Sequence, residues 1–322
     1  MWRKAQAAHP PGLETKYLLT SPERLVERPD TLYAPPVNAC LARENHANDA
    51  GSTGGCRAGL RHGGWARWDL ADGSGRAVKV TADGWRIVDD APGLFPTSSA
   101  RGALSEPAKG GSIHGLRERF GLSAYNEALI ILFCLGRLRG KGPYPILAIV
   151  GPESCGKTTL AAYLRALVDP ATPMLRNMPK KDVELAISAR DSHLLAYDGI
   201  EAVPTWFSRA ICKVSKGTAF SVYLKGQEQI LFQGARPVIL AGTEEMLLNR
   251  ELASRAMIVR LEPRTNFKSN MTEAFEGLAE MRGVQLDIVS HALSRQRDIE
   301  VPAPRKDFPS SLGLGACRPS SS

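Results

Sequence analysis

The pattern of apolar and polar positions first becomes regular at Trp65. The stretch WARWDLADGSGRAVKVTADGWRIVDD alternates apolar and polar side chains, and Asp72-Gly73 and Asp83-Gly84 stand where hairpin turns belong. This pattern predicts a small antiparallel β unit of about three strands within residues 61–95. Trp68 and Trp85, like Trp65, sit at strand spacing, which favours packing over base stacking.

Beyond the β unit the pattern changes to one of alternating strands and helices. Residues 96–143 read as a linker followed by helices, and the apolar run ALIILFCLG there is too short for a bilayer, so it indicates a buried helix. Residues 144–263 alternate strands with helices, which predicts a parallel sheet wrapped by helices. Residues 264–303 carry helical periodicity, whereas residues 1–60 and 304–322 show no sustained period and are expected to be poorly ordered.

The net charge and the cysteines of the chain indicate which partner and which cell compartment to expect. The 322 residues carry a formal net charge of +8, which permits an anionic partner such as DNA or RNA. The six cysteines form no C-x-x-C pair, and no apolar signal segment opens the chain. We therefore expect reduced thiols in a cytoplasmic protein without membrane segments.

One set of side chains resembles a zinc site. Cys40, His46, Cys56 and His62 form two similar pairs of potential ligands. Their spacing matches no common zinc finger, and the intervening Gly, Ser and Asn residues indicate a flexible segment. Zinc binding therefore stays an open alternative.

A phosphate-binding motif stands at the centre of the chain. Gly151, Gly156, Lys157 and Thr158 satisfy G-x-x-x-x-G-K-[ST], between the apolar run YPILAIV and the helical stretch TLAAYLRAL. Glycines let main-chain N–H groups turn towards phosphate oxygens, and the helix start adds the positive end of its dipole. We expect ATP to be held by nine successive residues: Gly151, Pro152, Glu153, Ser154, Cys155, Gly156, Lys157, Thr158 and Thr159.

Acidic residues complete the predicted catalytic set. The apolar stretch HLLAYD ends in Asp198, which we expect to share Mg²⁺ with the Thr158 hydroxyl, the alternative being an Asp that caps the next helix. The attacking water needs an orienting group. Glu201 and Glu153 are alternatives for that role, and the sequence does not choose between them.

Two later segments extend the site. The strand in RPVILAGTEEML ends at Ala241, where a polar sensor of the γ-phosphate is expected, with Thr243 and Glu244 just beyond. Arg255 precedes a further strand and, with Arg250 nearby, is a candidate to reach a neighbouring subunit's nucleotide; the alternative is a helix-terminal arginine that bonds carbonyls.

Between these segments, residues 218–237 read as a hairpin whose tip carries Lys225, beside Tyr223. Such a tip either touches a nucleic-acid backbone in a ring of subunits or is simply solvated.

From Trp65 to Phe308, about three-quarters of the chain, the order of features resembles one family. These are ATP-binding proteins of phages and integrated mobile elements, related to superfamily 3 helicases and primase-associated helicases of the AAA+ class. The resemblance rests on four stretches: GRAVKVTADGWRIVDDAP, GPYPILAIVGPESCGKTTLAAYLRALVDP, ARDSHLLAYDGIEAVPTWFSRAICKVSKGTAF and RPVILAGTEEMLLNRELASRAMIVRLEP. It implies an α/β P-loop NTPase fold of AAA+ type with ATP and Mg²⁺, an inter-subunit role for Arg255, and a hexameric ring acting on single- or double-stranded DNA.

The chain departs from that family's pattern in several places. Gly199 and Ala241 stand where the family usually has asparagine, the hairpin is about two residues shorter by the same comparison, and it lacks the expected arginine. Members of that family are expected to continue into further helices at the position where this chain stops, soon after APRKDFPSS. Each of the two missing asparagines would supply a positioned hydrogen bond, and losing one such bond costs about 10²–10³ in rate. The resemblance thus favours a DNA-dependent ATPase with weakened hydrolysis. The alternatives are a non-catalytic ATP-binding module or truncated remnant, and a recombinase-like filament ATPase. The segment GPESCGKTT closely resembles the phosphate loop of bacterial recombinases.

Overall fold

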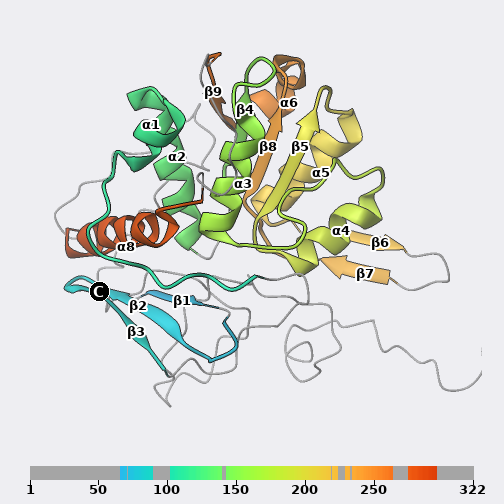
Figure 1. Ribbon diagram of the computed structural model, residues 1–322. Coiled ribbons are helices and arrows are strands. Elements are labelled where there is room, and N and C mark those ends of the chain that lie inside the picture. Colours follow the sequence, from blue (N-terminus) through green and yellow to red (C-terminus); the bar gives the residue numbers. More distant parts are fainter. Residues whose placement is uncertain are drawn as a thin grey trace, which may run out of the picture.

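A four-stranded parallel sheet forms the centre of the protein (Figure 1). The structure, a computed structural model, describes residues 66–70, 72–89, 102–139, 143–218, 220–223, 229–232, 234–263 and 275–295. The sheet has the order β5 (Leu195–Ile200), β8 (Val238–Gly242), β4 (Ile146–Val150) and β9 (Ala256–Arg260). Each neighbouring pair is parallel, so β8 lies between β4 and β5.

Helices cover both faces of the sheet, as expected for strands that are apolar at nearly every position. One face packs against α2 (Ala124–Gly136) and α3 (Lys157–Val168), and α1 (Gly115–Phe120) and α8 (Leu278–Ser294) pack in turn on these two helices. The other face packs against α4 (Asp182–Asp191), α5 (Thr205–Lys216), the 3-10 helix η3 (Glu244–Leu248) and α6 (Arg250–Ala253). The predicted α/β sheet flanked by helices is confirmed.

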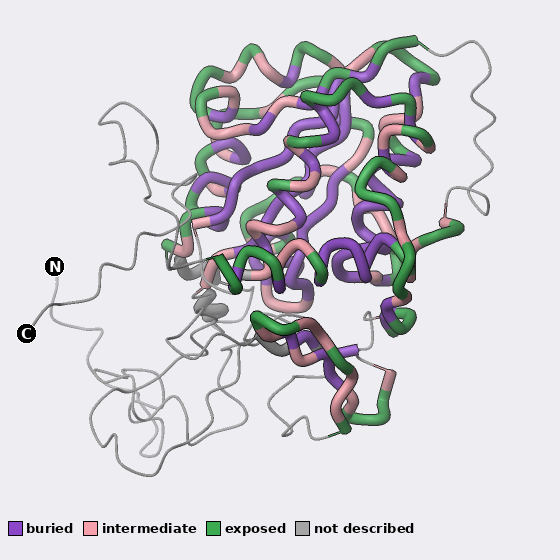
Figure 2. The backbone as a smooth tube through the Cα atoms, turned by 90° about the vertical axis from the view of Figure 1, so that its left-hand side faces the viewer, coloured by how far each residue is buried: buried purple, intermediate pink, exposed green. Residues whose placement is uncertain are grey.

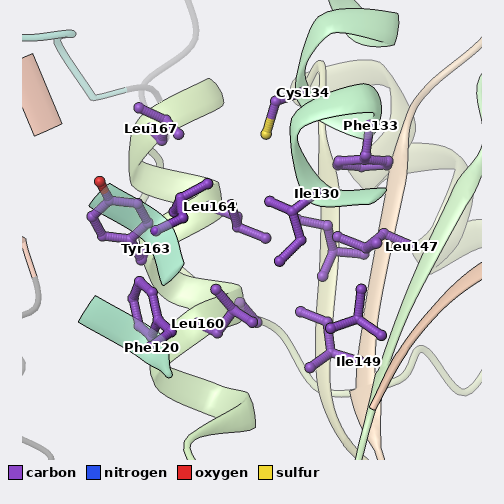
Figure 3. Packing of buried hydrophobic residues seen from close by; sticks show 14 of the residues in the cluster. Phe120, Ile130, Phe133, Cys134, Leu147, Ile149, Leu160, Tyr163, Leu164 and Leu167 are labelled. Carbon is purple, nitrogen blue, oxygen red and sulfur yellow. The ribbon is translucent and has the colours of Figure 1, made fainter. Parts of the chain in front are cut away.

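The first of these faces holds the larger core. Figure 3 shows Leu160 and Leu164 of α3 facing Leu147 and Ile149 of β4, and Ile130 of α2 lies between the two sets of side chains. Buried positions run through the strands, while exposed positions lie mainly on the periphery (Figure 2). This packing fixes the start of α3 relative to the end of β4.

The predicted small β unit is confirmed. It consists of β1 (Ala66–Asp69), β2 (Ala77–Thr81) and β3 (Gly84–Val88), paired antiparallel in that order. The second turn is centred one residue earlier than expected, because Thr81 pairs with Gly84 and leaves Ala82 and Asp83 as the turn residues.

The tryptophans of the β unit pack, as predicted. Trp68 is buried against α8, and Trp85 lies half-buried on the same helix, where its Nε1 donates to Asp287 Oδ1 at 2.8 Å. Trp65 lies outside the described residues. The β unit is therefore attached to the core through α8.

Helix ends follow local sequence signals. Ser123 caps α2 by accepting from the backbone N–H of Asn126, and α5 ends at Gly217, whose φ of 83° favours glycine. The predicted hairpin follows as β6 (Phe220–Tyr223) and β7 (Gln229–Phe232). Its tip with Lys225 lies outside the described residues, as do Cys40, His46, Cys56 and His62.

Cys134, Cys155 and Cys212 are buried free thiols. None of the helices in the described part of the chain combines the length and the apolar character needed to cross a bilayer. The apolar run in α2 is instead a helix that packs its inner face on β9 and the core.

Candidate functional site: a phosphate loop at the carboxyl edge of the sheet

The glycine-rich loop connects the end of β4 directly to the start of α3 (Figure 1). Three of its residues have positive φ: Gly151 at 155°, Ser154 at 58° and Gly156 at 94°. A Cβ on Gly151 would lie 2.5 Å from the carbonyl oxygen of Leu261, so the loop backbone packs against the end of β9. Only glycine fits this close approach, which explains the first residue of the motif physically.

Lys157 is the first residue of α3, and its side chain folds back over the loop. Its Nζ donates to the carbonyl oxygen of Gly151 at 2.9 Å and to that of Pro152. The ammonium therefore stands beside the positive end of the α3 dipole, where an anion is doubly favoured. Thr158, the next residue, is exposed, whereas Thr159 is buried.

Asp198 lies on β5, two strands away from the loop strand. Ala196 belongs to the core on the α3 face and Tyr197 to the core on the α5 face, and the half-buried Asp198 follows them near the carboxyl end of the strand. The strand continues past Asp198 to Ile200, with an irregularity between Tyr197 and Ile200. The N-cap of α5 is Pro204, so Asp198 does not cap that helix.

Gly199 lies within the irregular part of β5. Its φ of 69° is the left-handed region that favours glycine. On β8, a Cβ on Gly242 would collide with the carbonyl oxygen of Ile200. The same oxygen accepts a hydrogen bond from the backbone N–H of Thr243 at 2.9 Å. The ends of β5 and β8 are thus held tightly together.

Glu201 and Thr243 meet at this edge. The Thr243 hydroxyl donates to the Glu201 carbonyl oxygen at 3.3 Å, and the Glu201 side chain is exposed. Ala241, at the expected sensor position, is fully buried and offers no polar side-chain atom. Glu153 is also exposed, within the loop itself. The structure therefore gathers the loop, Asp198 and Glu201 along one edge and leaves the sensor position apolar.

Glu244 is placed differently from its neighbour Thr243. It forms an ion pair with Arg260 of β9, with Arg260 Nε 3.2 Å from Glu244 Oε1. Because β8 and β9 flank β4, this pair spans the strand that leads into the loop. Both side chains are about half exposed, so the pair contributes at most about 1 kcal/mol to stability.

Arg255 lies at the opposite edge of the sheet. It precedes β9, whose first residue Ala256 pairs with Ile146 at the start of β4. The five residues of β9 therefore separate Arg255 from the level of the loop, and a strand of five residues is about 16 Å long. Arg255 is half-buried and its Nε makes no hydrogen bond within the described residues. The structure does not bring Arg255 to this chain's own loop.

Two buried arginines hold the far end of α3, and the sequence did not single them out. Arg282 of α8 donates to the carbonyl oxygens of Ala166 at 2.7 Å and Leu167 at 3.2 Å. Arg137, in the 3-10 helix η2 (Arg137–Arg139), donates to the Gln285 side chain at 3.0 Å and lies 4.3 Å from the Trp68 ring. Burial lowers the pKa of each guanidinium to about 10, so both stay charged at neutral pH.

The donor set at the carboxyl edge suits a hard cation better than zinc. The described residues contain no group of three or more His, Cys, Asp or Glu that could hold a metal by itself. Thr158 and Asp198 offer oxygen donors, and Mg²⁺ is commonly bound through one or two carboxylates together with substrate phosphates and water. These residues fit Mg²⁺ arriving with a nucleotide.

Comparisons with solved structures give distant likenesses. The apo A form of the NrS-1 C-terminal region has a TM-score of 0.41 and 10% identity, over 68% of this chain and 64% of that one. An X-ray structure of JCV helicase has a TM-score of 0.29 and 17% identity, over 58% of this chain and 56% of that one. The chain thus spans less than two-thirds of either protein, and TM-scores this low add nothing to the assignment.

Sequence comparison is more decisive. No curated protein matches the chain. A family model described as actinomycete integrative conjugative element replication protein matches residues 116–312, which include the whole sheet, the loop and α8. Because this match covers more than half of the chain, the protein belongs to the family of replication proteins of actinomycete integrative conjugative elements.

Proposed function

We propose that this replication protein binds ATP at residues 151–159 and hydrolyses it slowly as a DNA-dependent, helicase-like ATPase. The observation that carries the proposal is the loop between β4 and α3. Its positive φ angles at Gly151 and Gly156, and the Lys157 ammonium folded over it, form a compact cationic turn at a helix start. Such a turn is suited to a polyphosphate.

Each residue of the site has a proposed role. Main-chain N–H groups of the loop bind phosphate oxygens, and Lys157 neutralises charge on the β- and γ-phosphates. Thr158 and Asp198 hold Mg²⁺, which stabilises the negative charge that develops on the transferred phosphoryl group. Asp198 lies near the carboxyl end of β5, at the same edge of the parallel sheet as the loop after β4, and this supports its pairing with Thr158.

Glu201 is the proposed water-orienting residue. It follows β5 directly, and its carbonyl accepts the Thr243 hydroxyl, so the backbone that carries it is fixed. Glu153 is the alternative, because it lies in the loop itself. Ala241 and Gly199 supply no side-chain hydrogen bond, and we expect turnover to be slower by about 10²–10³ for each missing contact.

DNA is the proposed polymer partner. Replication of an integrative element acts on DNA, and the net charge of +8 favours a polyanion. Arg255 lies too far from the loop of its own chain, and this supports a role at the nucleotide of a neighbouring copy in a ring. A cationic residue supplied in this way is worth about 10³–10⁵ in rate.

The direct test is phosphate release with and without DNA. The wild-type protein should release phosphate from ATP slowly, and single- or double-stranded DNA should raise the rate. Asp198→Asn, which keeps the size of the side chain but loses its charge, should abolish the release while the protein stays folded by circular dichroism.

A second function follows if phosphate release is absent but ATP still binds. The chain would then be a non-catalytic ATP-binding module. The specific observation in favour of this candidate is the fully buried Ala241 at the sensor position.

A further inference from the structure

Helix α5 has two chemically distinct faces. Phe207, Ile211 and Val214 are buried in the core that covers the α5 side of the sheet. On the outer face Arg209, Lys213 and Lys216 are all exposed. Because these three are spaced i, i+4 and i+7, they form one stripe, about 10 Å long. We call these three residues the α5 stripe.

The charge of the stripe is not balanced. The helix sequence TWFSRAICKVSK contains no Asp or Glu. Within the described residues, none of the three stripe residues forms an ion pair or a side-chain hydrogen bond. Like charges at these spacings destabilise a helix. Lys213 and Lys216 suit the last turn, but Arg209 is the fifth of twelve residues, where the helix dipole offers no compensation.

Helix α6, which packs on α5, brings charges of both signs near the stripe. Around the thiol of Cys212, whose pKa burial raises, the influence of Glu251 on α6 is opposed by Arg255 and Lys216. Near this thiol two cations therefore stand against one carboxylate.

The buried inner face narrows the choice of partner. A basic amphipathic helix binds a membrane by inserting its apolar face. In α5 that face is occupied by the core, so only the cationic stripe is available, and its partner must be a hydrophilic polyanion.

We propose that the α5 stripe binds the phosphate backbone of DNA, with each cation opposite one phosphate. This inference rests on the proposed function for its choice of DNA, but it concerns a surface separate from the nucleotide loop. Helix α5 follows β5, the strand of Asp198, and leads into the β6–β7 hairpin. DNA held on the stripe would thus contact the segment that joins the metal-binding strand to the hairpin.

The salt dependence of DNA binding tests this proposal. Arg209→Gln, Lys213→Gln and Lys216→Gln are combined in one variant, since glutamine keeps the helix propensity and removes the repulsion. Losing three phosphate contacts should lower the slope of log K against log salt by about 2.1 for single-stranded and about 2.7 for double-stranded DNA. The matched control combines Arg86→Gln, Lys180→Gln and Arg295→Gln, which removes the same charge from three exposed positions far apart in the sequence.

The outcomes separate this proposal from the proposed function. A smaller slope in the α5 variant alone, with ATP affinity unchanged, supports the stripe. An unchanged slope, or an equal loss in the control, overturns the stripe and leaves the ATPase proposal standing. Wild-type protein that binds ATP but no DNA overturns the DNA part of both.

Discussion

At the residue scale, His193 is an ionisable group placed where charge is unfavourable. It lies just before β5, is fully buried, and neither ring nitrogen makes a hydrogen bond within the described residues. Burial lowers the pKa of its imidazole from 6.5 to about 3, against the opposing influence of Asp169 and with help from Arg236. The ring of Tyr144 packs edge-on, 6.0 Å away between centroids. The folded protein therefore holds His193 neutral.

This burial predicts a loss of stability in acid. Between about pH 6.5 and pH 3 the unfolded chain binds a proton that the folded protein does not, so stability falls as pH falls. The free energy of unfolding should drop by about 1.4 kcal/mol per pH unit below 6.5, or about 2 kcal/mol from pH 7 to pH 5. His193→Leu should remove this part of the decline. Urea unfolding of both proteins at the two pH values measures it, and identical declines would contradict the assignment.

Some single-residue features could be predicted from the sequence and others could not. The identity of Gly151 follows from the phosphate motif, and the structure adds its contact with Leu261. Gly242 could not be recognised, because its close approach to Ile200 depends on the irregular end of another strand. Likewise, Asn126 donates to the carbonyl of Arg260 at 2.7 Å, a contact between segments far apart in the sequence.

At the element scale, α3 is held at both ends. Its first turn packs beside the loop, and its last carbonyls are bonded by arginines from η2 and α8. Cations at a helix carboxyl end oppose its negative dipole end. Because α8 also packs on the β unit, these bonds connect the β unit to the helix that follows the glycine-rich loop.

Removing one of these arginines should destabilise the protein. Arg282→Met keeps an unbranched side chain but leaves the carbonyls of Ala166 and Leu167 without their donors. We expect the free energy of unfolding to fall by about 2–4 kcal/mol, since each unsatisfied buried acceptor costs about 1–3 kcal/mol. Denaturant unfolding measures the change, and Arg295→Met at the exposed end of α8 is the control. Equal stability of the two variants would show that the bonds to α3 contribute nothing.

Elements themselves were largely predictable, because apolar periodicity reports burial. The β unit, the central strands, the hairpin and the last helix all lie where the pattern places them. The β2–β3 turn and the end of β5 differ slightly. In both places a glycine with positive φ shifts the boundary, and the pattern does not contain that backbone choice.

At the scale of the whole molecule, the topology of the sheet places the candidate site residues at two opposite ends of its strands. The order β5–β8–β4–β9 gathers Asp198, Glu201 and the loop at the carboxyl edge. Arg255 lies at the amino edge, so its proposed role requires a second copy. The sequence could identify Arg255 as a candidate, but the register of β9 was needed to place it.

Mixing two variants tests the role of Arg255 in a neighbouring copy. Arg255→Ala should lose phosphate release and keep its ATP affinity, because the nucleotide loop is intact. When the Arg255→Ala protein is mixed with the Asp198→Asn protein, part of the activity should return. An interface between one copy of each variant can bring an intact Asp198 together with an intact Arg255. Sedimentation with ATP should show a closed ring rather than a growing filament. Absence of any recovery, or an equal loss of ATP affinity, would rule out a role between copies.

The central claim is that residues 151–159 bind ATP, and equilibrium titration with a fluorescent ATP analogue and magnesium tests it most directly. Lys157→Ala removes a charge-assisted contact worth about 1.5–3 kcal/mol, so affinity should fall about 10- to 150-fold. Lys180→Ala, an exposed lysine before α4, should bind like the wild type. If the folded wild-type protein binds no nucleotide, or if the Lys157→Ala variant binds as tightly, the account is contradicted.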